Sequence, residues 1–131
     1  PARETAAPFS LDEVRRYLEA GAHRLHDHPQ NAYAAVAEAL ERILAGLEAH
    51  YDDLEELEQR LTALEEKMAA IARAAQSDED LFQARRELDL QLRPYRSKMT
   101  AAQLALLEKQ YLDRKLLEAA GLPRLSLFYL R

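Results

Sequence analysis

Hydrophobic positions recur at helical spacing along most of the chain, and their longest series runs from about Tyr33 to about Ala75. Within this range apolar residues alternate at intervals of three and four, the heptad pattern that buries one stripe of a helix against a partner helix. The seam positions are Tyr33, Val36, Leu40, Ile43, Leu47, His50, Leu54, Leu57, Leu61, Leu64, Met68, Ile71 and Ala75. Since His50 is their single polar member, the pattern predicts one continuous helix of about 65 Å at the usual helical rise.

Capping signals divide the rest of the chain into shorter predicted helices. Ser10 and Glu13 have the spacing of a capping box, in which each side chain accepts a hydrogen bond from the other residue's backbone N–H. Thr100 and Gln103 repeat that spacing, Ser77 precedes three acidic residues, and Gly121 follows an apolar series as a stop signal. The predicted helices therefore cover residues 11–26, 33–75, 77–93 and 100–120.

The fold class expected from this pattern is all-α, and the long helix needs a partner. One possibility is a parallel coiled coil of two chains. The other is an antiparallel hairpin that turns near Gln76 and Ser77 and has arms of similar length. The hairpin sets the acidic segment 52–66 beside the basic segment 85–98, and this complementarity favours it. The charged pairs expected in the hairpin are Glu56 with Lys98, Glu58 with Arg96, and Lys67 with Glu87.

The predicted last helix has more apolar surface than a single seam requires, with Leu104, Leu107 and Tyr111 on one side. We therefore expect the hairpin to be completed as a helical bundle by a second copy. Residues 1–9 are predicted to be a flexible lead. Residues 10–131 are predicted to form a single coiled-coil-like helical domain with an apolar tail, residues 122–131.

Composition and charge narrow the function classes. The chain lacks cysteine, which excludes disulfides, thiolate catalysis and cysteine-bound metals and is compatible with the cytoplasm, our expected location. It has neither an apolar run long enough to span a bilayer nor a signal-peptide core at its start. It begins with Pro1 rather than Met, which suggests a trimmed chain or an excised domain. Residues 1–80 carry 18 acidic and 8 basic side chains and the rest 5 and 10, so the two parts have opposite net charge.

The densest group of potential metal ligands is His23, His26 and His28. His23 and His26 are three residues apart on one helical face, a spacing that divalent metals can use. Histidine is also favoured near a helix C-terminus, and Pro29 indicates such an end here. We therefore expect no metal or other cofactor. Because the chain has neither a nucleophile triad nor a glycine-rich phosphate loop, we do not expect an enzyme.

The segment 117–129 contains an Ala-Ala-Gly-Leu turn followed by Leu-Phe-Tyr. It resembles the turn and recognition helix of TetR-type helix-turn-helix repressors, over about a tenth of the chain. The resemblance implies a DNA-binding regulator whose recognition helix follows the turn. Pro123 and Leu125 depart from that pattern, since recognition helices use polar side chains to read base edges.

The function predicted from the sequence is a non-enzymatic protein-interaction or scaffold module that self-associates through helical packing. Its expected partner is a second copy, most simply a homodimer, or another helical protein; nucleic acid is not the expected partner. The alternatives are the DNA-binding regulator and a metal-binding helical bundle. The residues expected to make interactions are Leu54, Leu57, Leu61 and Leu64 of the seam, and Leu127, Phe128 and Tyr129 of the tail.

Overall fold

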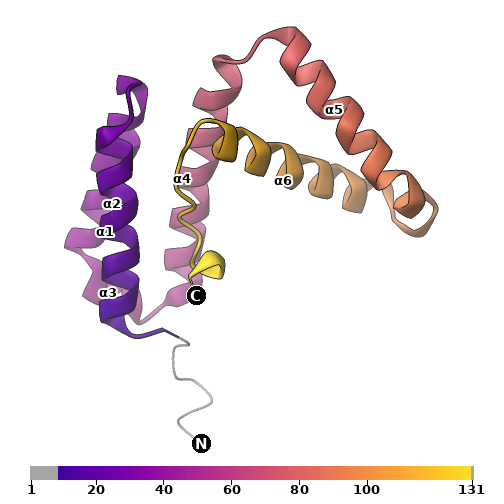
Figure 1. Ribbon diagram of the computed structural model, residues 1–131. Coiled ribbons are helices and arrows are strands. Elements are labelled where there is room, and N and C mark those ends of the chain that lie inside the picture. The colour runs from indigo at the N-terminus through magenta and orange to yellow at the C-terminus, as the bar shows by residue number, and fades with distance from the viewer. Residues whose placement is uncertain (1–8, 131) are drawn as a thin grey trace, which may run out of the picture. The chain divides into compact units, whose positions relative to one another are not determined.

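The computed structural model of the chain describes residues 9–130, in which every regular element is helical (Figure 1). The predicted lead, residues 1–9, lies outside the described residues except for Phe9. The elements are α1 (Leu11–Asp27), η2 (Asn31–Tyr33), α2 (Ala34–Ala45), α3 (Leu47–Tyr51), α4 (Leu54–Ala74), α5 (Asp78–Leu92), η3 (Arg93–Lys98), α6 (Ala101–Ala119) and η4 (Leu127–Tyr129). Among these described elements, none is a helix long and apolar enough to cross a bilayer.

The prediction of one continuous helix over residues 33–75 was wrong, because the chain leaves helical geometry twice in that range. Gly46 ends α2 with φ −108° and ψ 19°. Glycine is costly inside a helix because it has the most backbone freedom to lose. Asp53 then accepts a hydrogen bond from the Glu56 N–H at 3.0 Å, as an N-cap does, so that α4 starts anew. The heptad pattern outweighed these two local signals in the prediction.

The predicted ends of the shorter helices were closer to the structure. Ser10 and Glu13 form the capping box at the start of α1, and Thr100 and Gln103 form the one at the start of α6. Ser77 caps α5 by accepting the Asp80 N–H. Gly121 has φ +70°, a left-handed conformation that only glycine adopts without strain, and it ends α6.

The described chain divides into two compact units, and the expectation of a single domain stays a prediction. Unit 1 contains the chain up to Met68 together with the tail from Leu122, and unit 2 contains residues 69–121. In unit 1, α1 packs on α2. Nine of the thirteen predicted seam positions are buried, from Tyr33 to Met68. The heptad pattern therefore identified the buried stripe, although in α2 the element that covers it is α1.

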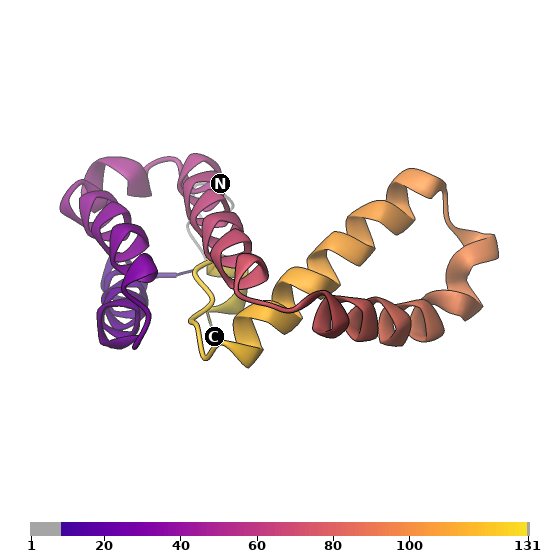
Figure 2. The same ribbon diagram turned by 90° about the horizontal axis from the view of Figure 1, so that it is seen from above.

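Unit 2 consists of the end of α4, then α5, η3 and α6. Figure 2 shows α6 running back from η3 toward the start of α5. We call residues 78–119 the α5–α6 arm. Only a few large apolar side chains of the arm are buried, namely Leu88, Leu92 and Leu117.

The predicted antiparallel pairing of residues 52–66 with residues 85–98 stays a prediction. One of its expected pairs has different partners: Glu58 accepts hydrogen bonds from the tail, whereas Arg96 forms ion pairs with Asp89 and Glu108.

Candidate functional site

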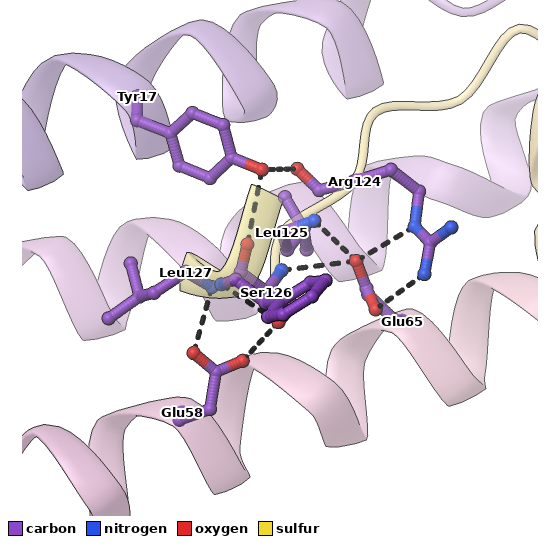
Figure 3. Close-up of polar contacts among 8 residues, drawn as sticks. Tyr17, Glu58, Glu65, Arg124, Leu125, Ser126 and Leu127 are labelled. Atoms are coloured by element: carbon purple, nitrogen blue, oxygen red, sulfur yellow. Dashed lines mark hydrogen bonds and ion pairs between the residues drawn. The ribbon is translucent and has the colours of Figure 1, made fainter. Parts of the chain in front are cut away.

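The tail folds back onto unit 1, where a buried carboxylate of α4 holds it (Figure 3). Glu65 is only 7% exposed. It accepts hydrogen bonds from the backbone N–H of Leu125 at 2.6 Å and of Ser126 at 3.1 Å. The Arg124 side chain adds two more, from Nε at 3.2 Å and Nη2 at 3.4 Å. A buried carboxylate is costly unless it is paired and fully hydrogen-bonded, and these four donors meet that condition.

A second carboxylate of the same helix holds the next residues of the tail. Glu58 lies seven residues before Glu65, which is about two helical turns, so both side chains are on one face of α4. Glu58 accepts the Leu127 N–H at 2.8 Å and also the Ser126 hydroxyl. Ser126 in turn accepts the Phe128 N–H at 3.2 Å and so starts the η4 turn. Together the two carboxylates accept three consecutive backbone N–H groups of the tail.

A tyrosine of α1 holds the carbonyl groups of the same stretch. The Tyr17 hydroxyl donates to the Arg124 carbonyl at 2.6 Å and also lies 3.3 Å from that of Ser126 (Figure 3). Burial, and secondly the negative charge of Glu65, raise the pKa of Tyr17 to about 12. The hydroxyl therefore keeps its proton at neutral pH and can donate. We call Tyr17, Glu58 and Glu65 the tail clamp.

Apolar packing completes the clamp. Leu125 is fully buried, and its Cδ2 lies only 2.9 Å from the place where a Cβ on Gly21 would be. The missing side chain of Gly21 thus lets the tail approach α1 closely. On the outer side, the Arg124 guanidinium lies over the Tyr129 ring, 4.1 Å from its centroid. The clamp can hold an extended peptide by its backbone.

Unit 2 presents a different kind of surface. The large apolar residues Phe82, Leu90, Tyr95 and Leu106 are between 52% and 60% exposed, and all belong to α5, η3 or α6. Leu90 is two residues from each of the buried Leu88 and Leu92, a turn of about 200° around the helix. The exposed leucine therefore lies on the side of α5 opposite its buried stripe.

The chain matches no protein-family model, and no curated protein or solved structure is significantly similar to it. An assignment of function therefore has to be based on the geometry of the chain's own residues.

The structure separates the residues for which the sequence predicted interactions. Leu57, Leu61 and Leu64 are buried, whereas Leu54 is half-buried. In the tail Leu127 is buried, but Phe128 is 73% and Tyr129 42% exposed. Burial in the core of unit 1 thus accounts for four of these residues, and Leu54, Phe128 and Tyr129 keep surface available for a partner.

The three candidate metal-ligand histidines have three different neighbours. His23 Nε2 lies 3.1 Å from Asp27, and His26 Nε2 lies 3.1 Å from Glu41. The His28 ring packs edge-on against Tyr33 and accepts the Gln30 N–H. Within residues 9–130, no three His, Asp or Glu side chains come together as a metal site.

The recognition helix that the TetR-type resemblance implied does not form. Residues 122–126 are not helical, and η4 is a turn of three residues. Leu125, which that helix would direct toward DNA, is fully buried. The backbone N–H groups of Leu125, Ser126 and Leu127 donate to Glu65 and Glu58, so this stretch is held by α4 instead of forming a helix of its own.

No local feature of the sequence indicated the clamp residues directly. Glu58 and Glu65 belong to a chain with 31% charged residues, in which most carboxylates are solvated. The sequence shows that Glu58 and Glu65 share one face of the predicted helix and that the tail is apolar. The contact between these glutamates and the tail, however, depends on how the chain turns back at Gly121.

Proposed function

We propose that this chain is a non-enzymatic protein-interaction module that self-associates through the α5–α6 arm. In this proposal unit 1 is a folded part of the chain that does not supply the exposed apolar surface. The observation that supports the proposal is the set of exposed apolar side chains on the arm: Phe82, Leu90, Tyr95 and Leu106. Single exposed apolar residues are common on protein surfaces, but several on one short stretch are typical of an interface.

The contrast between the two units supports the arm as the interface. Among the described residues, the large exposed apolar side chains lie on the arm or in the tail, at Phe128 and Tyr129, and not on α1 to α4. Unit 1 has thus covered its apolar stripe with its own chain, whereas α5 retains the exposed Leu90 on the face opposite its buried stripe. A second copy that covers this face completes a helical bundle by dimerisation, the architecture expected from the sequence.

The charges of the chain support the same partner. The acidic segment 52–66 and the basic segment 85–98, whose complementarity predicted a hairpin within one chain, can pair equally well between two chains.

The experiment is the mass of the full chain in solution, measured by light scattering over a range of concentrations. We expect the wild type to reach about twice the 15.0 kDa of one chain. The double variant Leu90→Ser/Leu106→Ser should shift toward the monomer, while Gln83→Ser, an exposed polar position on α5, should behave as wild type. Circular dichroism checks that the helices persist.

A third variant separates the two exposed apolar surfaces. Phe128→Ser removes an exposed aromatic side chain from the tail and leaves the arm intact. A dimer that survives Leu90→Ser/Leu106→Ser but dissociates in Phe128→Ser would assign the interface to the tail and overturn the proposal for the arm. A wild-type chain that is monomeric at all concentrations would overturn self-association itself.

A further inference from the structure

Unit 2 contains a cleft of about 200 Å³ between the end of α4, the start of α5 and the end of α6. Its apolar lining is Leu81, Ala84, Leu112, Leu116 and Ala119. The polar residues around it are Arg73, Gln76, Asp80, Arg85 and Lys115. Typical small-molecule sites enclose roughly 300 to 1,000 Å³, whereas a cavity of about 150 Å³ accommodates one benzene ring. The cleft is therefore suited to a single large apolar side chain.

The charge of the cleft indicates the chemistry around that side chain. Arg73, Arg85 and Lys115 face one acid, Asp80. Arg73 is held by Asp113 at 2.7 Å, and Lys115 lies 5.5 Å from the Tyr111 ring centroid, so both are positioned from outside the cleft. Because Asp113 already pairs with Arg73, the cations left beside Asp80 are Arg85 and Lys115, and this positive excess favours a partner with carboxylates on both sides of its apolar residue.

This chain has a segment with that chemistry. Leu54 is preceded by Asp52 and Asp53 and followed by Glu55 and Glu56, and all four acids are exposed. Leu54 itself is half-buried, while Leu57, Leu61 and Leu64 of the same stripe are buried. Leu54 is thus the predicted interaction leucine that the core of unit 1 uses least.

Helix α4 separates Leu54 from the cleft residue Arg73 of the same chain. Leu54 and Arg73 both belong to the single helix α4 and are nineteen residues apart, which is about 28 Å of helix. Arg73 is part of the cleft. We propose that the cleft of unit 2 accepts Leu54 of a second copy of this chain, with Asp52 and Glu55 of that copy beside Arg85 and Lys115.

This inference rests on the proposed self-association and names the segment that meets the arm. Each copy carries one cleft and one Leu54 segment, so a two-fold symmetric dimer makes the contact twice. A contact with opposite charges on its two sides also weakens as ionic strength rises, because salt screens exposed charges.

Two charge-reversal variants of the full chain test the contact. One reverses the cleft, Arg85→Glu/Lys115→Glu. The other reverses the segment, Asp52→Lys/Glu55→Lys, and leaves intact the Asp53 cap and the Glu56–Arg60 ion pair at 3.0 Å. Each variant alone places like charges at both contacts, so we expect its dimer to dissociate at least about tenfold more readily than wild type. The control is Arg16→Glu/Arg42→Glu, which reverses two exposed arginines of α1 and α2, outside both the cleft and the arm, and should leave the dissociation constant within about twofold of wild type.

The decisive measurement is a mixture of the two reversal variants. In a mixed dimer the acidic cleft of one chain meets the basic segment of the other, and the reciprocal contact is of wild-type sign. We therefore expect the mixture to dimerise although neither variant does so alone. Pairing within one chain cannot be rescued by mixing, and neither can a folding defect.

The outcomes separate this inference from the proposed function. If both reversal variants remain dimeric while Leu90→Ser/Leu106→Ser dissociates, the arm is the interface and the Leu54 contact is overturned. If the reversal variants dissociate and their mixture stays monomeric, the contact is also overturned. A monomeric wild type overturns both the contact and the proposed function.

Discussion

The two units differ in how they bury the apolar side chains of their helices. Unit 1 covers the stripe with its own chain: α1 packs on α2, and Leu125 of the tail is fully buried in the same unit. In unit 2, α5 packs on α6, and Leu90 and Leu106 remain exposed. The difference shows that heptad spacing identifies what is to be buried but not which element covers it.

The units also differ in how they use charge. In unit 1 the carboxylates of Glu58 and Glu65 accept backbone N–H groups and help to hold the tail in place. In unit 2 ion pairs such as that of Arg93 with Asp89 join exposed side chains, although Asp113, the partner of Arg73 and Lys109, is only 16% exposed. Exposed pairs contribute little to stability because water and salt screen them, whereas the loss of a buried, paired carboxylate is costly. The buried carboxylates of unit 1 therefore help to hold its fold together, whereas exposed charged side chains of unit 2 can contact a partner.

The largest effect on the difference between the units is expected when the buried carboxylate is removed from unit 1. Glu65→Ala leaves the Arg124 guanidinium and two backbone N–H groups without their acceptor, and we expect unit 1 to lose about 3 to 5 kcal/mol. Hydrogen exchange of the backbone amides measures the two units separately. Glu55→Ala, an exposed carboxylate on the same helix, is the control and should change protection by less than about 0.5 kcal/mol. Equal effects of the two substitutions would contradict the clamp.

The next largest effect compares one leucine from each unit. Leu125→Ala opens a cavity beside Gly21 in unit 1, and we expect a loss of about 2 to 5 kcal/mol. Leu106→Ala removes an exposed side chain from unit 2 and should change the stability of the monomer by no more than about 0.5 kcal/mol. Hydrogen exchange at low protein concentration, where association is minimal, makes the comparison. If Leu106→Ala destabilises unit 2 as much as Leu125→Ala destabilises unit 1, the arm is a packed core and not an interface.

Much of this fold could be predicted from local signals. The capping boxes at Ser10 and Thr100 and the stop at Gly121 require only neighbouring residues, and the structure has all three. Buried positions such as Leu40 and Leu61 followed from periodicity, which does not depend on the identity of the partner element.

The candidate site could not be predicted in the same way. Glu65 and Leu125 are sixty residues apart in sequence and meet only because the chain leaves unit 1 after Met68 and returns at Leu122. Nothing local to Glu65 distinguishes it from Glu66, which is exposed. The break at Gly46 was visible in the sequence, but a sustained heptad pattern predicted a continuous helix there. Local rules thus place the ends of helices, while the return of the chain decides which carboxylate is buried.

The smallest expected effect refines the account of the clamp and depends on pH. Tyr17→Phe removes the hydroxyl that donates to the Arg124 carbonyl, and we expect a loss of about 1 kcal/mol at neutral pH. The pKa of Tyr17 is raised from 10.0 to about 12 in the folded chain, so the unfolded chain loses this proton first as pH rises. The contribution of the hydroxyl is therefore complete below pH 10 and is lost as pH rises toward 12. Urea unfolding of both proteins at several pH values should show the stability of the wild type falling relative to that of Tyr17→Phe above pH 10. A stability difference that stays constant through this range would mean that the Tyr17 hydroxyl is not buried beside Glu65, and its place in the clamp would be overturned.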